Sequence, residues 1–128
     1  MLGKLSNNNN NYSFINISYV HESTPQPEGA PYAASIGGME MITKTVALEL
    51  VDKGIRVNTI APGVIATDMN KDLLEDMQKK KEKEKEIPVK RIGQSEEIAK
   101  VASFLESNGA NYITGTTIYV DGCLMLSS

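Results

Sequence analysis

A long helical segment between two short β-strand segments is the sequence feature that most constrains the fold. Over residues 32–52 apolar side chains recur with helical spacing, and Gly54 follows where a helix often ends in a left-handed residue. The flanking segments 12–18 and 55–61 are short and rich in branched and aromatic residues, which is typical of β-strands. This order predicts two parallel strands joined by a right-handed helical crossover.

The rest of the chain extends the same pattern. A second amphipathic helix is predicted to begin near residue 95 and to end at Asn108-Gly109, and a third strand covers 116–120. The sequence therefore predicts an α/β fold with three parallel strands and two main helices. Residues 7–11 are all asparagine, so we expect residues 1–11 to be an Asn-rich, disordered lead-in, and residues 12–128 to form the folded unit.

The balance of charges excludes several classes of partner. Thirteen basic and sixteen acidic residues give a net charge of −3, which removes the electrostatic case for nucleic acid or an anionic membrane as the main partner. Residues 79–86 are eight consecutive charges of both signs, which is typical of a solvated face. One cysteine and one histidine are too few for a disulfide framework or a typical structural zinc site. We therefore expect no metal and a cytoplasmic location.

Several short blocks, in this order and spacing, resemble the C-terminal half of the short-chain dehydrogenases/reductases. The blocks are Tyr32-Ala33-Ala34-Ser35 with Gly37-Gly38, Gly54-Ile55-Arg56-Val57-Asn58, Ala61-Pro62-Gly63 with Thr67, and Thr114-Gly115 with Val120-Asp121-Gly122. The resemblance runs from about residue 14 to about residue 124. Val20-His21-Glu22, after the first strand, is most similar to the bacterial glucose 1-dehydrogenase group.

The resemblance implies a partial Rossmann-type sheet, consisting of its last three strands with flanking helices. It also implies NAD(P)-dependent oxidoreduction of a sugar or another secondary alcohol. The glycine-rich turn that binds the cofactor phosphates in such folds occurs nowhere in the sequence. Gly37-Gly38 is not such a turn, because it lies inside the long predicted helix and follows no strand. The chain is therefore expected to be a truncated member, and the residues that distinguish NAD from NADP belong to the absent half.

By resemblance, Tyr32 is the residue that exchanges a proton with the substrate oxygen. A phenol has an unperturbed pKa of about 10, and the family lowers it with a lysine one helical turn later. Here that position is Ile36, which offers no charge. The family's serine position is Tyr19, and Ser18 before it would point to the opposite face of the strand. The expected catalytic set is therefore incomplete.

The other half of the cofactor pocket is retained. The family residues that meet the nicotinamide correspond to Pro62, Gly63, Val64, Ile65 and Thr67. His21 could contact a polyol substrate, although a lone histidine beside a loop is more often a surface residue. Cys123 stands where the family commonly has a second glycine, and we expect a packing or neutral role for it.

Three hypotheses for function follow. The chain could be an inactive, truncated dehydrogenase, or a module that pairs with copies of itself or with full-length relatives. It could also be one half of a split enzyme completed by a separate N-terminal half, which Tyr19 and Ile36 disfavour. In the family, strand 12–18 has a neighbour in the absent half. We therefore expect its outer edge to be bare, so that the chain forms a homo-oligomer, binds a relative or aggregates.

Overall fold

The computed structural model describes residues 2–8, 11–18 and 29–127. Its main sheet has four strands in the order β1-β2-β3-β6: β1 (Leu2–Asn8), β2 (Asn11–Ile17), β3 (Ile55–Pro62) and β6 (Thr117–Val120). β3 is parallel to both β2 and β6, whereas β1 is antiparallel to β2. Two short parallel strands, β4 (Ile65–Ala66) and β5 (Gly93–Gln94), form a second sheet.

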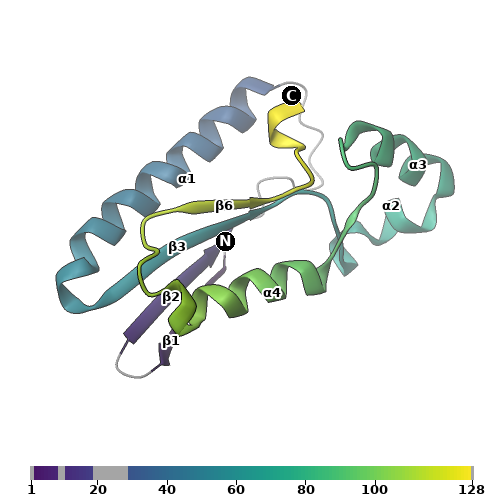
Figure 1. Cartoon of the computed structure of the whole chain (residues 1–128). Coiled ribbons are helices and arrows are strands. Elements are labelled where there is room, and N and C mark those ends of the chain that lie inside the picture. Colours follow the sequence, from purple (N-terminus) through teal and green to yellow (C-terminus); the bar gives the residue numbers. More distant parts are fainter. Residues whose placement is uncertain (1, 9–10, 19–28, 128) are drawn as a thin grey trace.

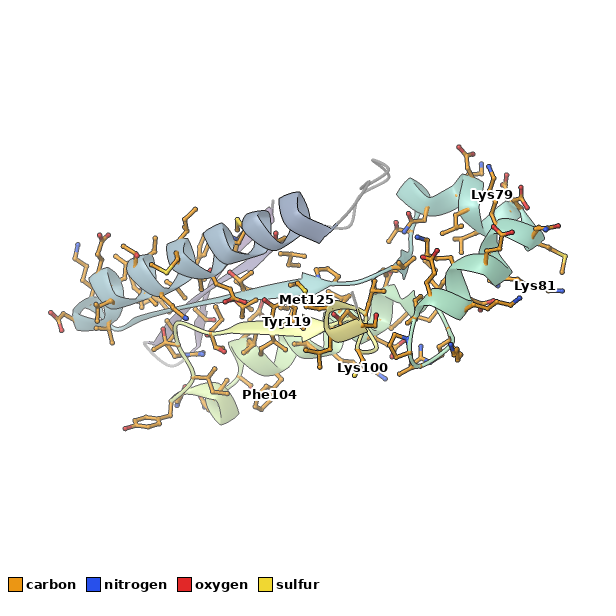
Figure 2. All side chains as sticks on the ribbon, turned by 90° about the horizontal axis from the view of Figure 1, so that it is seen from above. Lys79, Lys81, Lys100, Phe104, Tyr119 and Met125 are labelled. Atoms are coloured by element: carbon orange, nitrogen blue, oxygen red, sulfur yellow. The ribbon has the colours of Figure 1, made fainter. Side chains whose placement is uncertain are left out.

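The two main helices lie on opposite sides of the sheet (Figures 1 and 2). They are α1 (Gly29–Leu50) and α4 (Ser95–Glu106). Two smaller helices, α2 (Lys71–Glu75) and α3 (Met77–Glu86), project beyond one end of the sheet, and Lys79 and Lys81 of α3 point outward (Figure 2). In the described part of the chain, short 3₁₀ turns also lie at Val51–Lys53, Asp68–Asn70, Asn108–Ala110 and Met125–Ser127.

The predicted α/β fold is confirmed. β2, α1 and β3 form the expected parallel pair with its helical crossover, and β6 is the third parallel strand. Gly54 follows α1 and its 3₁₀ turn with a φ of 72°, the left-handed conformation that the sequence predicts there. The charged helix α3 contains no buried residue, in agreement with an exposed face.

The N-terminal segment differs from its prediction. Residues 2–8 form β1 and pair with β2 from Leu2 opposite Ile17 to Asn8 opposite Asn11, where a lead-in without regular structure was expected. The outer edge of β2 is therefore covered by its own chain, and the expectation of a bare edge is wrong. The physical reason is local. A short connection places residues 2–8 beside β2, whose backbone groups need partners.

The core lies mainly between the sheet and α4. Its buried members come from β2, β3, β4, α4 and the turn after α4, and they are Ile15, Ile60, Ile65, Ile98, Leu105 and Ala110. On the other face, α1 is joined to β3 by two buried hydroxyl groups, since Thr43 Oγ1 and Thr59 Oγ1 are 2.7 Å apart. Thr43 Oγ1 donates its hydrogen to the Met39 carbonyl, so Thr59 must be the donor between the two threonines.

Arg56 joins the central strand to the end of α4. The residue is 7% exposed, and its guanidinium group donates to the carbonyl oxygens of Leu105 and Ala110, both at 2.8 Å, and to that of Ile113 at 3.3 Å. These carbonyls lie at or after the C-terminus of a helix, where such groups lack intrahelical partners and carry partial negative charge. Burial lowers the pKa of Arg56 from its usual value, and a guanidinium group with so high a starting pKa stays charged.

Asn58 continues the same connection along β3. Its side chain is fully buried, donates to the Ile113 carbonyl at 3.0 Å and accepts from the Thr116 amide at 3.1 Å. The Thr114 hydroxyl accepts from the Val57 amide, and the Gly115 amide donates to the Val57 carbonyl at 2.7 Å. These bonds fix the segment that leads from α4 into β6.

Replacement of Arg56 by methionine should destabilise the chain by about 3 kcal/mol, because several buried carbonyl oxygens lose a charged donor. Urea denaturation measures the change, with Arg56→Lys expected to be intermediate because one ammonium group cannot reach the same set of carbonyls. Arg91→Met removes an arginine from an exposed ion pair and serves as the control. Equal loss in the Arg56 and Arg91 variants would contradict the role given to the Arg56 contacts.

Among the described residues, no helix combines the length and apolar character that crossing a membrane requires.

Candidate functional site

The three parallel strands end at one edge of the sheet, and the candidate site lies there. β2 ends at Ile17, β3 at Pro62 and β6 at Val120, and α1 begins near the same edge (Figure 1). In open α/β sheets, ligands bind outside the carboxyl ends of parallel strands. The topology therefore brings together the ends of β2 and β3, the turn that follows β3 and the first turn of α1.

The structure describes only some of the positions that the sequence predicts to take part in catalysis. Tyr32 is the fourth residue of α1 and Ile36 follows one turn later, so the helix puts both positions near the edge that carries the site. Ser18 is buried, and its amide donates to the Ile60 carbonyl at 2.9 Å, which aligns it with β3. Tyr19 and His21 lie outside the described residues.

The turn after β3 is closely packed, and glycine is required in it. The Gly63 amide donates to the Val120 carbonyl at 3.0 Å, which joins this turn to the end of β6. A Cβ atom on residue 63 would lie 2.7 Å from the Asp121 Cβ and 2.9 Å from its Cα. Only glycine fits at this approach. Pro62 before it is fully buried.

Val64 and Ile65 carry the chain from this turn into the small second sheet. Both side chains are buried, and the Val64 carbonyl accepts from the Gly93 amide at 2.9 Å. The Ile65 carbonyl accepts from the Asn70 side-chain amide. The backbone from 63 to 65 is thereby held in one conformation by bonds to three other segments.

Thr67 lines an open pocket. It precedes the Asp68–Asn70 turn, its carbonyl accepts from the Asn70 amide at 3.0 Å, and its side chain is partly exposed. The pocket has a volume of about 400 Å³ and is lined by Ala66, Thr67, Asp68, Lys71, Leu74 and Glu75. The structure thus brings Thr67 together with charged side chains of α2 that the sequence did not single out.

Asp121 is a residue of this region whose role sequence reasoning missed. One of its carboxylate oxygens accepts from the Cys123 amide and the other from the Met125 amide, both at 3.0 Å. Its backbone also packs against Gly63. The Gly122 carbonyl accepts from the Val89 amide at 3.3 Å, which connects the turn to the segment after α3. An Asp-Gly pair after a strand predicts a turn, and Asp121 belongs to one of the blocks of the family resemblance, but neither signal indicates its contacts with Gly63 and Met125.

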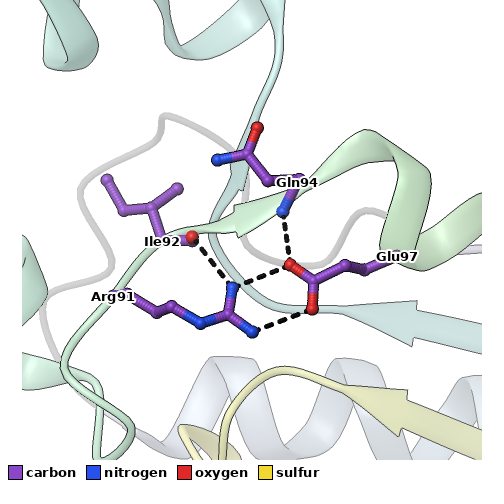
Figure 3. Close-up of polar contacts among 4 residues, drawn as sticks. All are labelled: Arg91, Ile92, Gln94 and Glu97. Atoms are coloured by element: carbon purple, nitrogen blue, oxygen red, sulfur yellow. Dashed lines mark hydrogen bonds and ion pairs between the residues drawn. The ribbon is translucent and has the colours of Figure 1, made fainter.

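Arg91 and Glu97 form an exposed bidentate pair beside the second sheet (Figure 3). Arg91 Nη1 donates to Glu97 Oε1 at 2.7 Å, and Nη2 donates to Oε2 at 2.9 Å. Glu97 Oε1 also accepts from the Gln94 amide at 3.0 Å. The hydrogen bonds from Arg91 and Gln94 lower the pKa of Glu97 to about 2. A carboxylate held ionised in this way orients the start of α4 and is a poor general acid or base at neutral pH.

No group of three or more histidine, cysteine, aspartate or glutamate side chains gathers in a metal-binding arrangement within residues 2–8, 11–18 and 29–127.

Cys123 occupies a position whose backbone favours glycine. Its φ is 73°, in the left-handed region, and it follows Gly122 at 62°. A residue with a Cβ pays about 1 kcal/mol or more for this conformation, whereas glycine adopts it without that cost. The backbone conformation at residue 123 thus favours glycine, which by the resemblance is the common family residue at this position.

Cys123→Gly should raise the free energy of unfolding by about 0.5–1 kcal/mol. Glycine removes the strain of the left-handed conformation in the folded chain, and its greater flexibility in the unfolded chain offsets part of that gain. Cys123→Ser keeps the Cβ atom and is the matched control, with little expected change. Both are measured by urea denaturation under reducing conditions. A glycine variant less stable than the serine variant would show that residue 123 is not strained.

Comparison with known proteins gives consistent matches. A family model described as enoyl-(acyl carrier protein) reductase matches residues 3–124. Glucose 1-dehydrogenase 2 of Bacillus subtilis (strain 168) is 45% identical over 125 residues, which are 98% of this chain and 48% of that protein. 3beta-Hydroxysteroid dehydrogenase 1 of Eggerthella lenta is 47% identical over 112 residues, 88% of this chain and 43% of that protein.

A solved structure agrees with these sequence matches. The crystal structure of a gluconate 5-dehydrogenase from Burkholderia cenocepacia J2315, in complex with NADP and tartrate, matches with a TM-score of 0.73 and 35% identity. The match covers 89% of this chain and 45% of that one. The chain therefore spans about half the length of the relatives that it matches.

Proposed function

This chain belongs to the short-chain dehydrogenase/reductase family, and we propose that it supplies the nicotinamide-facing half of an NAD(P)-dependent oxidoreductase acting on a sugar or another secondary alcohol. Enzymes of this family use NAD or NADP, and relatives have been solved with NADP bound. The observation that supports the proposal is that β2, β3 and β6 end at one edge of the sheet, near which α1 begins with the Tyr32 position in its first turns (Figure 1).

The residues present fit one end of the cofactor. The turn at 62–65 is fixed by hydrogen bonds to other segments, and Thr67 just after it lines the open pocket. By the family resemblance, Pro62, Gly63, Val64, Ile65 and Thr67 would hold the nicotinamide end. The chain has no glycine-rich turn between a strand and a helix N-terminus, so nothing in it matches the pyrophosphate. Its residues therefore do not fit the whole dinucleotide, and we infer that the chain alone does not bind it.

The catalytic positions support the same inference. Tyr32 would exchange a proton with the substrate oxygen, but Ile36 cannot lower the pKa of a phenol as a lysine one turn away would. Each pKa unit of assistance that is lost corresponds to about 1.4 kcal/mol, or a factor of ten. Tyr19 in place of the family serine adds bulk where substrate would lie. We therefore propose that the chain is inactive by itself.

The substrate class rests on the relatives alone. Their names include a glucose dehydrogenase and a steroid dehydrogenase at nearly equal identity, 45% and 47%. What these substrates share is a secondary hydroxyl group. The resemblance of Val20-His21-Glu22 to the glucose dehydrogenases favours a sugar or polyol, with His21 as a candidate substrate contact.

A second candidate function is favoured by the surface of α1. Met41, Ile42 and Leu48 are 63%, 52% and 78% exposed, so this helix carries apolar side chains on its outer face as well as toward the sheet. Exposed apolar surface of this kind marks interaction sites. The chain could therefore act without catalysis, as a module that pairs with full-length relatives or with a separate N-terminal half.

Purified chain should oxidise neither glucose nor related alcohols with NAD or NADP, and Ile36→Lys with Tyr19→Ser should not change this, because neither substitution builds a phosphate site. In a chimera that carries the N-terminal half of Glucose 1-dehydrogenase 2, the same two reversions should raise the rate at least about tenfold over the unreverted chimera. The measurement is NAD(P)H absorbance, and Tyr32→Phe in the reverted chimera is the control that should abolish the gain.

Turnover by the unmodified chain that is lost in Tyr32→Phe would refute the proposed inactivity. A folded, cofactor-binding chimera that stays inert after both reversions would show that positions 19 and 36 are wrongly assigned.

A further inference from the structure

β1 is the edge strand next to β2, and it is the antiparallel member of an otherwise parallel four-stranded sheet. All seven of its residues pair with β2. β2 would become the edge of the sheet if β1 were to leave.

The direction of each amide in β2 follows from two hydrogen bonds. The Tyr12 amide donates to the Gly54 carbonyl at 3.4 Å, and the Ser18 amide donates to the Ile60 carbonyl at 2.9 Å. Even-numbered amides of β2 therefore point to β3, and successive residues of a strand point their amides to opposite sides. The amides of Ser13, Ile15 and Ile17 consequently point to β1.

The register of β1 against β2 shows which amides of β1 point toward β2. Ser13 is opposite Ser6, and Ile15 is opposite Lys4. In an antiparallel pair, two directly opposed residues either exchange both hydrogen bonds or exchange none. The amides of Lys4 and Ser6 therefore point into the pair, whereas those of Leu5 and Asn7 point to the open edge.

The two strands differ in how strongly their sequences favour a sheet. Gly3, Lys4, Asn7 and Asn8 are residue types that are depleted in strands, so β1 is a weak strand by composition. β2 is rich in aromatic and branched residues and contains neither a charged residue nor proline. Strands of this second kind pair readily with other strands when their edges are free.

β2 also carries an aromatic face that α1 leaves partly open. Ser13 and Ile15 face α4, because the Ser13 hydroxyl donates to the Leu105 carbonyl and Ile15 belongs to the core there. Tyr12 and Phe14 therefore face the side of α1, where they are 39% and 36% exposed. An uncovered β2 would thus present a ladder of backbone groups and an aromatic surface together.

We propose that β1 is a detachable strap that closes the β2 edge, and that this edge, when open, takes the β2 strand of a second copy of the chain. A second copy fits because β2 is uncharged, so two such strands brought together meet no like-charge repulsion. A two-fold pairing also joins identical edges and identical aromatic faces. The strap would keep the chain monomeric, and its release would permit association.

Proline substitutions at neighbouring positions test the strap. Ser6→Pro removes an amide that points into the pair, whereas Asn7→Pro removes one that points to the open edge, where proline is tolerated. In dilute samples, in which Ser6→Pro is still monomeric, amide hydrogen exchange should show the amides of Ser13, Ile15 and Ile17 at least about tenfold less protected than in the unmodified chain. Phe14 and Asn16, whose amides point to β3, should be unchanged and so report that the sheet is intact.

Light scattering on the same variants at higher concentrations tests whether a second copy binds. The unmodified chain and Asn7→Pro should be monomers, and Ser6→Pro should shift toward a dimer as its concentration is raised. Lys4→Pro removes the other inward-pointing amide and should reproduce the Ser6→Pro result.

Equal protection in the Ser6→Pro and Asn7→Pro variants would overturn the strap. Loss of protection at the odd-numbered amides without any increase in mass would overturn docking of a second copy. These readouts are independent of catalysis, so a failure here is distinct from a failure of the proposed oxidoreductase function.

Discussion

The contact between Arg56 and the end of α4 is the constraint on which the rest of the structure depends. Three carbonyl oxygens at and after the helix C-terminus receive one buried guanidinium group from the central strand. Asn58, two residues later on the same face, fixes the segment that leads into β6. The position of β6 in turn determines where Asp121 meets Gly63. A structural side chain in the middle of β3 therefore sets the geometry of the turns at its end.

At the C-terminal end of β3, the candidate site consists of the turn after β3 and the turn after β6, which contact each other. Gly63 packs on Asp121, Asp121 caps its own turn, and Gly122 binds Val89. These contacts hold the turn at residues 62–65 in one conformation, as the proposed contact with the nicotinamide end of a cofactor would require. It also shows why the functional blocks of the sequence are rich in glycine, since two backbones approach closely at Gly63.

The parallel strands and both main helices were predictable because each has a clear period and clear ends, as in the run from Tyr32 to Gly54. The pairing of β1 was not predictable, because an Asn-rich segment has little strand propensity. Its pairing depends on the edge of β2 beside it. The roles of Arg56 and Asn58 were also hidden. A sequence shows that a strand contains polar residues, but only the fold shows that they face the carbonyl oxygens left at a helix end.

The central claim is that the chain keeps the nicotinamide end of a cofactor site and lacks the phosphate end. Titration of the purified chain with NADPH, followed by amide chemical shifts in NMR, tests it most directly. The account predicts no saturable binding up to roughly millimolar cofactor, with at most weak shifts near Gly63, Val64 and Thr67. Saturable binding with a dissociation constant of about 100 µM or below would contradict it, because such affinity requires a phosphate site that the sequence does not contain.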